Sequence, residues 1–299
     1  MNKIVLWGHK LHQSTHSYVQ HGYYKAFKQL GWEVYWVDSR DNLDSIDFAN
    51  SVFMIEHSVR RGMPIRKDCK YIVLWSNSTA PDDYHYIDEL VEQGVPYENI
   101  LKLGDYLPQY ECNEKIADLT YWSNSKRHLW QPWGTDLLPN EIDTDDYVSF
   151  NPNAKKLHYV AMLYDQGHWW AQEFANIIGE KHGVEFMVYT QNATDEENRN
   201  FIRESFLCPD FRSDWHLQCG YIPCRMWKNI SYGRITGTNS PLVKRALGDY
   251  VVFGGTPQTL YQNLLEAEMN KTVNMKEAMT FVKEQHTYIN RVNNILKFL

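Results

Sequence analysis

Residues 3–37, KIVLWGHKLHQSTHSYVQHGYYKAFKQLGWEVYWV, contain the pattern of strands and a helix from which the fold class is predicted. The apolar run at residues 4–7 is typical of a short buried strand. Residues 17–30 then place apolar side chains at helical spacing, and Gly31 ends this helix. A second apolar run follows at residues 34–37. A strand, a helix and a strand in this order predict the start of a mostly parallel sheet that is covered on both faces.

The alternation continues through the chain and restarts once. Further strand-like runs lie at residues 52–55, 71–75, 100–103, 119–122, 157–162, 184–189 and 251–253, and two long helices are predicted at residues 257–269 and 275–299. Between the two series, residues 133–153 carry Gly134, Pro139 and a cluster of acidic side chains, which are typical of a linker. We therefore predict an α/β protein with two Rossmann-like domains that face each other across a cleft. The predicted domains are residues 1–140 and 141–299, with the last helix packing back on the first domain.

Length and composition narrow the class of protein. The 299 residues suffice for two domains, and the formal charge of -7 argues against a nucleic-acid partner, which usually selects a basic surface. No apolar run approaches the roughly 18 residues that a membrane span needs, and the first residues show no leader. The five cysteines form no C-x-x-C pair, so neither a disulfide framework nor a zinc site is expected. A soluble, cytoplasmic protein is therefore predicted.

The loop after the first strand is the first candidate site. It carries His9 and His12, and it leads to His16, which follows two residues that can cap the next helix. An imidazole beside a helix N-terminus tends to stay neutral and is suited to act as a general base. The alternative is a surface or capping histidine.

Residues 221–241, YIPCRMWKNISYGRITGTNSP, form the second candidate site. Arg225 and Lys228 are three residues apart on a predicted short helix, so they share a face that suits a diphosphate. The next helix is predicted to start at Ser240, where free backbone amides can bind phosphate oxygens. The alternative is a solvated basic turn before an ordinary helix.

Several common motifs do not occur. The chain has no G-x-G-x-x-G after its first strand, no P-loop, no G-x-S-x-G and no H-E-x-x-H. Asp143 and Asp145 spell the D-x-D pattern that holds a metal in some transferases, but they lie in the acidic linker, where a solvated charge cluster is the better interpretation.

The stretch at residues 221–240 and the segment STHSYVQHGYYKAFKQLGW at residues 14–32 resemble GT-B nucleotide-sugar glycosyltransferases of bacterial and large-virus glycan gene sets. The resemblance implies transfer of a hexosyl or pentosyl group from a nucleoside diphosphate sugar, UDP favoured over GDP, to a glycan hydroxyl. The donor would be held by the C-terminal domain, its diphosphate neutralised by cationic side chains, so that neither a metal nor another cofactor is expected. The donor-binding residues implied are Arg225, Lys228, Tyr232, Gly233, Thr238, Asn239 and Ser240, and residues 209–212 are expected to hold the nucleobase.

The absence of a motif typical of retaining enzymes indicates the stereochemistry of the transfer. Retaining GT-B enzymes often carry Glu-x7-Glu in the second half, and no glutamate lies between Glu204 and Glu266 here. An inverting reaction is therefore predicted, in which a base deprotonates the acceptor hydroxyl. His16 is the first candidate for this base, with Asp38 and His57 as alternatives. The competing hypotheses are a two-lobed sugar-binding protein without catalysis and an epimerase or phosphorylase of similar fold.

Overall fold

The computed structural model describes residues 2–8, 10–11, 16–56, 59–75, 84–105, 119–161, 163, 165–189 and 193–299. The described chain divides into two compact units. Unit 1 contains the described residues up to 105 together with residues 119–133 and 288–299, and unit 2 contains those from 134 to 287. The boundary expected between residues 140 and 141 thus lies inside unit 2, and the C-terminal segment belongs to unit 1.

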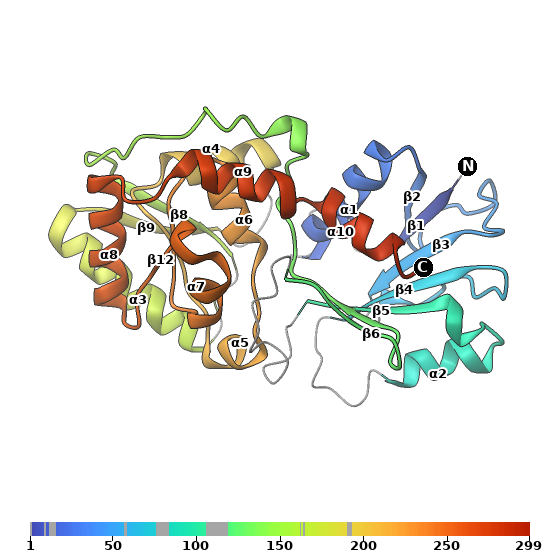
Figure 1. The fold of residues 1–299 in the computed structure, drawn as a ribbon. Helices are drawn as coiled ribbons and strands as arrows, with labels where there is room; N and C mark the ends of the chain where they lie inside the picture. The colour runs from blue at the N-terminus through green and yellow to red at the C-terminus, as the bar shows by residue number, and fades with distance from the viewer. Residues whose placement is uncertain are drawn as a thin grey trace. The chain divides into compact units, whose positions relative to one another are not determined.

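Unit 1 is built on one sheet with the strand order β2-β1-β3-β4-β5-β7-β6 (Figure 1). All neighbouring strands are parallel except β6 and β7, which are antiparallel. The strands are β1 (Lys3–Trp7), β2 (Glu33–Val37), β3 (Val52–Glu56), β4 (Lys70–Trp75), β5 (Ile100–Gly104), β6 (Tyr121–Ser123) and β7 (His128–Trp130).

Helices cover both faces of this sheet, as near-continuous apolar strands require. Successive residues of β1 are fully buried, because neighbouring side chains point to opposite faces. Ile87 and Leu90 of α2 pack into one cluster with Phe53 and Val73. The other helices of unit 1, α1 and α10, contact each other. The helices are α1 (His16–Gln29), α2 (Tyr84–Glu92), the 3-10 turn η3 (Tyr97–Asn99) and α10 (Tyr288–Leu296).

A glycine permits the contact between α1 and α10. A Cβ atom on Gly22 would lie 2.2 Å from the ring of Tyr288. The same ring meets Tyr23 edge to face, with 4.8 Å between the centroids. Unit 1 therefore depends on the C-terminal helix for part of its core.

The described part of unit 2 contains five short parallel strands. The pair β8-β9 and the group β10-β11-β12 are each hydrogen-bonded in parallel. The amide of Phe206, just before β10, donates to the carbonyl of Lys156 in β8 at 2.8 Å, which links the two groups. The strands are β8 (Lys156–Val160), β9 (Glu185–Tyr189), β10 (Cys208–Asp210), β11 (Thr236–Thr238) and β12 (Val251–Phe253).

The helices of unit 2 connect these strands. Four of the described helices have side-chain caps, for example Thr194, whose hydroxyl accepts from the amide of Glu197 at the start of α4. The helices are α3 (Asp165–His182), α4 (Asp195–Glu204), α5 (Asp214–Cys219), α6 (Cys224–Ser231), α7 (Pro241–Leu247), α8 (Pro257–Asn270) and α9 (Met275–Gln285), with 3-10 turns η4 (Pro139–Glu141) and η5 (Gly248–Tyr250).

Two predicted elements are wrong in detail. The strand expected at residues 119–122 is a hairpin, β6 and β7, whose second strand the apolar pattern did not indicate. The helix expected at residues 275–299 is two helices, α9 and α10, separated at His286 and Thr287. The break is tertiary in origin, because the carbonyl of His286 accepts the amide of Thr135 at 2.9 Å. Within the described part of the chain, no helix is long and apolar enough to cross a membrane.

Candidate functional site

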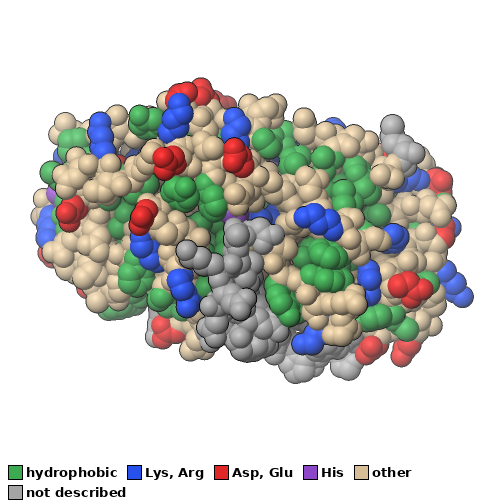
Figure 2. All heavy atoms as spheres, in the orientation of Figure 1, with side chains coloured by type: hydrophobic (Ala, Val, Ile, Leu, Met, Phe, Trp, Pro, Cys, Tyr) green, Lys and Arg blue, Asp and Glu red, His purple; other side chains and the backbone are tan. Residues whose placement is uncertain are grey.

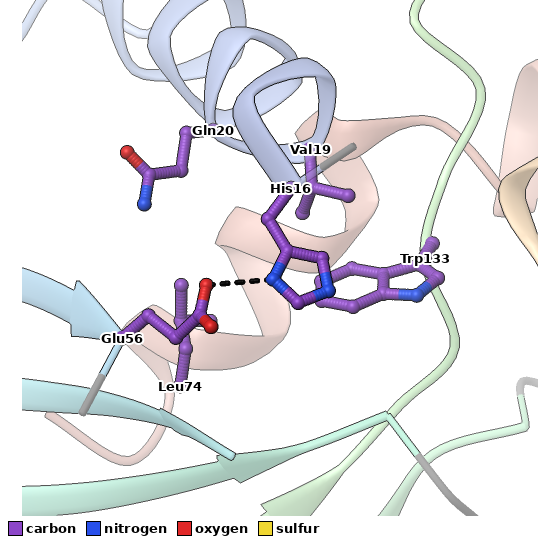
Figure 3. A pocket seen from close by; sticks show the side chains of 6 residues that line it. All are labelled: His16, Val19, Gln20, Glu56, Leu74 and Trp133. Carbon is purple, nitrogen blue, oxygen red and sulfur yellow. Dashed lines mark hydrogen bonds and ion pairs between the residues drawn. The ribbon is translucent and has the colours of Figure 1, made fainter. Parts of the chain in front are cut away.

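The carboxyl edge of the unit 1 sheet brings together a histidine and a glutamate. β1 lies between β2 and β3, so the strand order reverses here, and open α/β sheets bind ligands at such a point. His16 is the first residue of α1, and Glu56 is the last residue of β3. The Nδ1 atom of His16 lies 2.8 Å from Oε2 of Glu56 (Figure 3).

The pair sets the charge of the imidazole. Burial lowers the pKa of His16, but the hydrogen bond to Glu56 and its negative charge outweigh burial, so the net pKa lies above the usual 6.5. A neutral ring is the expectation for a histidine beside a helix N-terminus. The structure differs because the neighbouring carboxylate favours the protonated ring. When the ring is neutral, Glu56 keeps the proton on Nδ1, and Nε2 is then the basic nitrogen.

A small cavity of about 10 Å³ adjoins this pair (Figure 3). Its volume suits one water molecule or one hydroxyl group. The ring of Trp133 lies 6.4 Å from that of His16, measured between centroids. The lining residues are His16, Val19, Gln20, Glu56, Leu74 and Trp133.

The other residues considered as bases differ from His16. Asp38, after β2, accepts two side-chain hydrogen bonds from Arg40, one of them at 2.6 Å from Nη2, and these hold the pKa of Asp38 below its usual value. Asp38 is therefore a weaker proton acceptor than an ordinary aspartate. His57 lies outside the described residues. Asp105, just after β5, is buried, and burial together with the charge of Glu56 raises the pKa of Asp105 well above its usual value.

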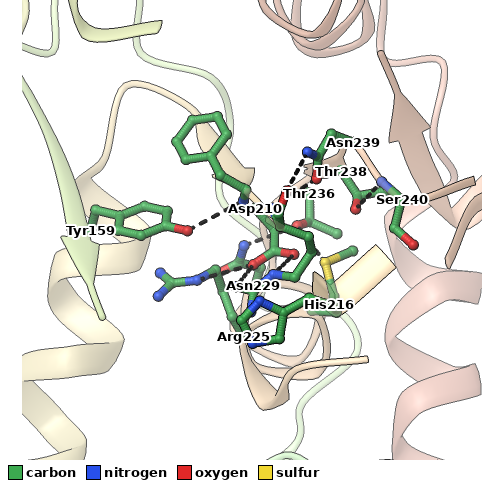
Figure 4. A network of polar contacts seen from close by, with 12 residues as sticks. Tyr159, Asp210, His216, Arg225, Asn229, Thr236, Thr238, Asn239 and Ser240 are labelled. Carbon is green, nitrogen blue, oxygen red and sulfur yellow. Dashed lines mark hydrogen bonds and ion pairs between the residues drawn. The ribbon is translucent and has the colours of Figure 1, made fainter. Parts of the chain in front are cut away.

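In unit 2, a cluster of charges lies at the carboxyl ends of the strands (Figure 4). Asp210, the last residue of β10, is fully buried between two arginines. Nε of Arg212 donates to it at 2.8 Å, and Nε of Arg225 lies 3.4 Å from it. The guanidinium of Arg225 also stacks on Tyr159, 3.8 Å from the ring centroid, and donates to the carbonyl of Val160 at the end of β8. Two cations share one carboxylate, which leaves a net positive charge.

Lys228, the second predicted phosphate ligand, contacts a different carboxylate. Its Nζ lies 3.1 Å from Oδ2 of Asp136, and both side chains are almost fully buried. The hydroxyl of Tyr232 lies 2.7 Å from each oxygen of the same Asp136. Burial lowers the pKa of Lys228, but Asp136 outweighs it and raises the net pKa, so the ammonium stays charged. Tyr232 is fully buried, so its described role is to hold Asp136.

The remaining predicted donor residues make internal contacts. Gly233 has a φ of +81°, and a Cβ there would lie 2.6 Å from the Cα of Tyr147, so the chain requires glycine. Thr238 accepts the amide of Ser240, and Ser240 caps α7. The amide group of Asn239 bonds the backbone nitrogen and carbonyl of Arg212, each at 2.8 Å. Of these four residues, Asn239 also lines a cavity.

That cavity has a volume of about 570 Å³, within the range of small-molecule sites. The end of β12 and the segments that follow β11 and β12 form one side of it, and helices α3 and α5 form the other. Trp169 is 55% exposed, so an aromatic surface is open to a ligand. The lining residues are Trp169, Trp170, Asp214, Leu217, Asn239, Pro241, Phe253 and Gly255.

The carboxylates that pair with His16 and Arg225 were not predicted from the sequence. Residues 209–212 were expected to hold a nucleobase, but Phe211 is buried among aromatic rings and Asp210 is buried in ion pairs. Glu56 was not among the predicted bases, although the adjacent His57 was. The position of each carboxylate at the end of an apolar strand was the feature that could have indicated Glu56 and Asp210.

Comparison with solved structures defines the class of fold. An alpha-glucosyltransferase in complex with UDP and a 13-mer DNA matches at 9% identity, with 100% of this chain and 99% of that chain covered and a TM-score of 0.64. AviGT4, a glycosyltransferase involved in avilamycin A biosynthesis, matches at 12% identity over 99% and 98% of the chains, with a TM-score of 0.53. An E. coli trehalose-6-phosphate structure with bound UDP-2-fluoro glucose matches at 10% identity over 99% of each chain, with a TM-score of 0.50.

These likenesses show that the chain has the GT-B fold, and the predicted α/β class and the resemblance to GT-B glycosyltransferases are confirmed. No protein-family model matches the sequence, and no curated protein matches it either.

Proposed function

We propose that this protein is a glycosyltransferase that moves a sugar from a nucleoside diphosphate sugar, UDP favoured over GDP, to a glycan hydroxyl. The observation that carries the proposal is the carboxyl edge of the unit 2 strands. There a cavity of about 570 Å³ is lined by two tryptophans and by Asn239. The side chain of Asn239 bonds the backbone of Arg212, which belongs to a cluster that keeps a net positive charge.

The donor is expected to bind at this edge. Arg225 carries the charge that Asp210 does not neutralise, because Arg212 already pairs with that carboxylate. A diphosphate would accept charge-assisted hydrogen bonds from Arg225, and from Lys228 in competition with Asp136. Aromatic faces such as Trp169 suit a nucleobase. The UDP in the matched structures supports the same donor class.

The acceptor is expected to meet His16. Nε2 of the neutral ring would take the proton of the acceptor hydroxyl while Glu56 holds Nδ1–H. The acceptor oxygen then bonds to the anomeric carbon, whose bond to the diphosphate oxygen breaks, and UDP leaves with that electron pair. One displacement inverts the configuration. Cationic side chains would stabilise the leaving group, so we propose that no metal is required.

A glycan is the proposed acceptor, and DNA is the second candidate. The chain has a formal charge of -7, and on the face shown in Figure 2 the described Lys and Arg side chains lie among Asp and Glu without a continuous basic stripe. Such a surface favours a neutral acceptor. DNA deserves a direct test, because one matched alpha-glucosyltransferase was solved with a 13-mer DNA.

The experiment is a donor and acceptor screen with the 299-residue protein. Binding of UDP, GDP, ADP and CDP is measured by thermal shift. Release of the nucleoside diphosphate, UDP or GDP, is measured with UDP-glucose, UDP-xylose and GDP-fucose against oligosaccharides and a DNA duplex. UDP release with a product of opposite anomeric configuration, detected by proton NMR, supports the proposal. Binding of free sugars without nucleotide binding would favour a sugar-binding protein, and donor interconversion without acceptor would favour an epimerase.

A further inference from the structure

Gln20 of α1 is a buried amide at the cavity beside His16 and Glu56. It is 1% exposed and lines the cavity. Its Oε1 accepts a hydrogen bond from Nε1 of Trp36 at 3.1 Å. The same indole nitrogen also donates to the carbonyl of Gly8 at 2.9 Å. Because an indole nitrogen can only donate, its contact with Gln20 favours the oxygen at this end of the amide. In Figure 3 the amide nitrogen is the end that lies on the side of Glu56.

The amide nitrogen has an unused hydrogen-bond capacity. Among the described residues, Nε2 of Gln20 is buried without a hydrogen-bond partner. Buried donors in folded proteins are nearly always paired with protein or with water, so an unpaired one on a cavity wall indicates that an oxygen atom is bound there. The cavity of about 10 Å³ has room for one such oxygen.

We infer that Gln20 is a positioning residue that holds the attacking hydroxyl oxygen of the acceptor, which gives this cavity the role of an acceptor-oxygen subsite. The inference rests on the proposed function. Nε2–H of Gln20 donates to a lone pair of the hydroxyl, the hydroxyl proton passes to His16, and the oxygen bonds to the anomeric carbon. The apolar walls, Val19 and Leu74, leave room for the hydroxyl and for no larger polar group.

The chemical class of acceptor follows from this geometry. A donor hydrogen bond from an amide suits a neutral hydroxyl, and the nearby carboxylate of Glu56 disfavours an anionic acceptor group. The subsite therefore selects an alcohol oxygen of a sugar or of a hydroxylated base. Water fits the same position, so hydrolysis of the donor is the smallest reaction that uses the subsite.

The test replaces Gln20 with methionine, which keeps the length of the side chain and removes the amide. Gln29→Met is the matched control, because Gln29 is the exposed last residue of the same helix. Three quantities are measured for each protein: UDP affinity, kcat and KM for hydrolysis of UDP-glucose, and Tm. For Gln20→Met we expect kcat to fall about tenfold, as for the loss of one hydrogen bond, with KM and UDP affinity unchanged. Gln29→Met should match the wild type.

Gln20→Leu is the second variant in case methionine prevents folding. It is apolar and of similar size, it removes the amide donor, and Nε1 of Trp36 keeps its hydrogen bond to the carbonyl of Gly8, so the same fall in kcat is expected. An unchanged kcat in a folded variant overturns the inference. Equal losses of kcat and of UDP affinity overturn it as well, because they indicate a structural role.

A crystal structure of the wild type separates this inference from the proposed function. An ordered oxygen within about 3.2 Å of Nε2 of Gln20 supports the subsite, and an empty cavity overturns it. If the wild type neither binds UDP nor hydrolyses UDP-glucose, the proposed donor chemistry fails, and the crystallographic result still decides whether Gln20 binds an oxygen.

Discussion

Replacing Arg225 with methionine is the sharpest test of the donor site. Methionine keeps an unbranched side chain over the ring of Tyr159 and removes the guanidinium. Asp210 does not become an isolated buried charge, because Arg212 still donates to it. The variant should therefore fold, and its effect should appear in ligand binding.

The size of the effect follows from the charges of this cluster. Arg212, Arg225 and Asp210 together carry one net positive charge, and the variant reduces this charge to zero. One charge-assisted hydrogen bond is worth about 1.5–3 kcal/mol. UDP affinity should therefore fall about 10- to 150-fold, since every 1.4 kcal/mol is a factor of ten. The Arg225 side chain is 10% exposed, so solvent screens this interaction little.

Isothermal titration calorimetry with UDP measures the affinity, and thermal unfolding checks the fold. Lys276→Met is the control, because it also removes one positive charge from unit 2, at an exposed ion pair with Asp145. The control should bind UDP as the wild type does. An Arg225→Met protein with wild-type Tm and wild-type UDP affinity would refute this assignment of the donor site.

Three further predictions concern the base, the buried ion pair and metals. Glu56→Gln should lower the pKa of His16, because the charge that raises it is lost while burial remains; NMR titration should show this, and the acid limb of the rate profile should move to lower pH. In the wild type, the ion pair of His16 and Glu56 should stabilise the fold at low pH, and this stabilisation should be lost as the pH rises through the raised pKa of His16. The free energy of unfolding of the variant, measured in urea, should therefore depend less on pH over this range. Asp136→Asn should cost about 3–5 kcal/mol of unfolding free energy because Lys228 loses its buried counter-charge, whereas Asp145→Asn should cost at most about 1 kcal/mol; equal costs would contradict this. Activity should survive EDTA, and a loss that Mg²⁺ or Mn²⁺ restores would contradict the metal-free mechanism.

The elements of the fold that could be predicted are those that a local pattern of apolar residues determines. Apolar runs such as residues 4–7 and 52–55 indicated buried strands because both faces of the sheet are covered. The strand β7 was not predicted because it is only three residues long, and two apolar residues after His128 are too few to indicate a strand. The break between α9 and α10 was not predicted, because a backbone hydrogen bond with Thr135 causes it and no glycine or proline lies at the break.

The sequence predicted where the candidate site residues lie, but not which side chains pair with them. His16 and Arg225 could be named because loops after parallel strands carry ligand sites. Their carboxylate partners, Glu56 and Asp210, lie 40 and 15 positions away in sequence, and spacing alone does not show which strand ends meet. These partners change the chemistry, since Glu56 raises the pKa of a histidine that was expected to be neutral.

The return of the last helix to unit 1 has a consequence for the order of folding during synthesis. Residues 134–287, which form the described part of unit 2, leave the ribosome in one stretch. Unit 1 is begun first and completed last, because Tyr288, Val292 and Ile295 of α10 are buried in it. Most of unit 2 therefore leaves the ribosome before α10 does, and until α10 docks, unit 1 exposes the apolar face of α1 around Gly22.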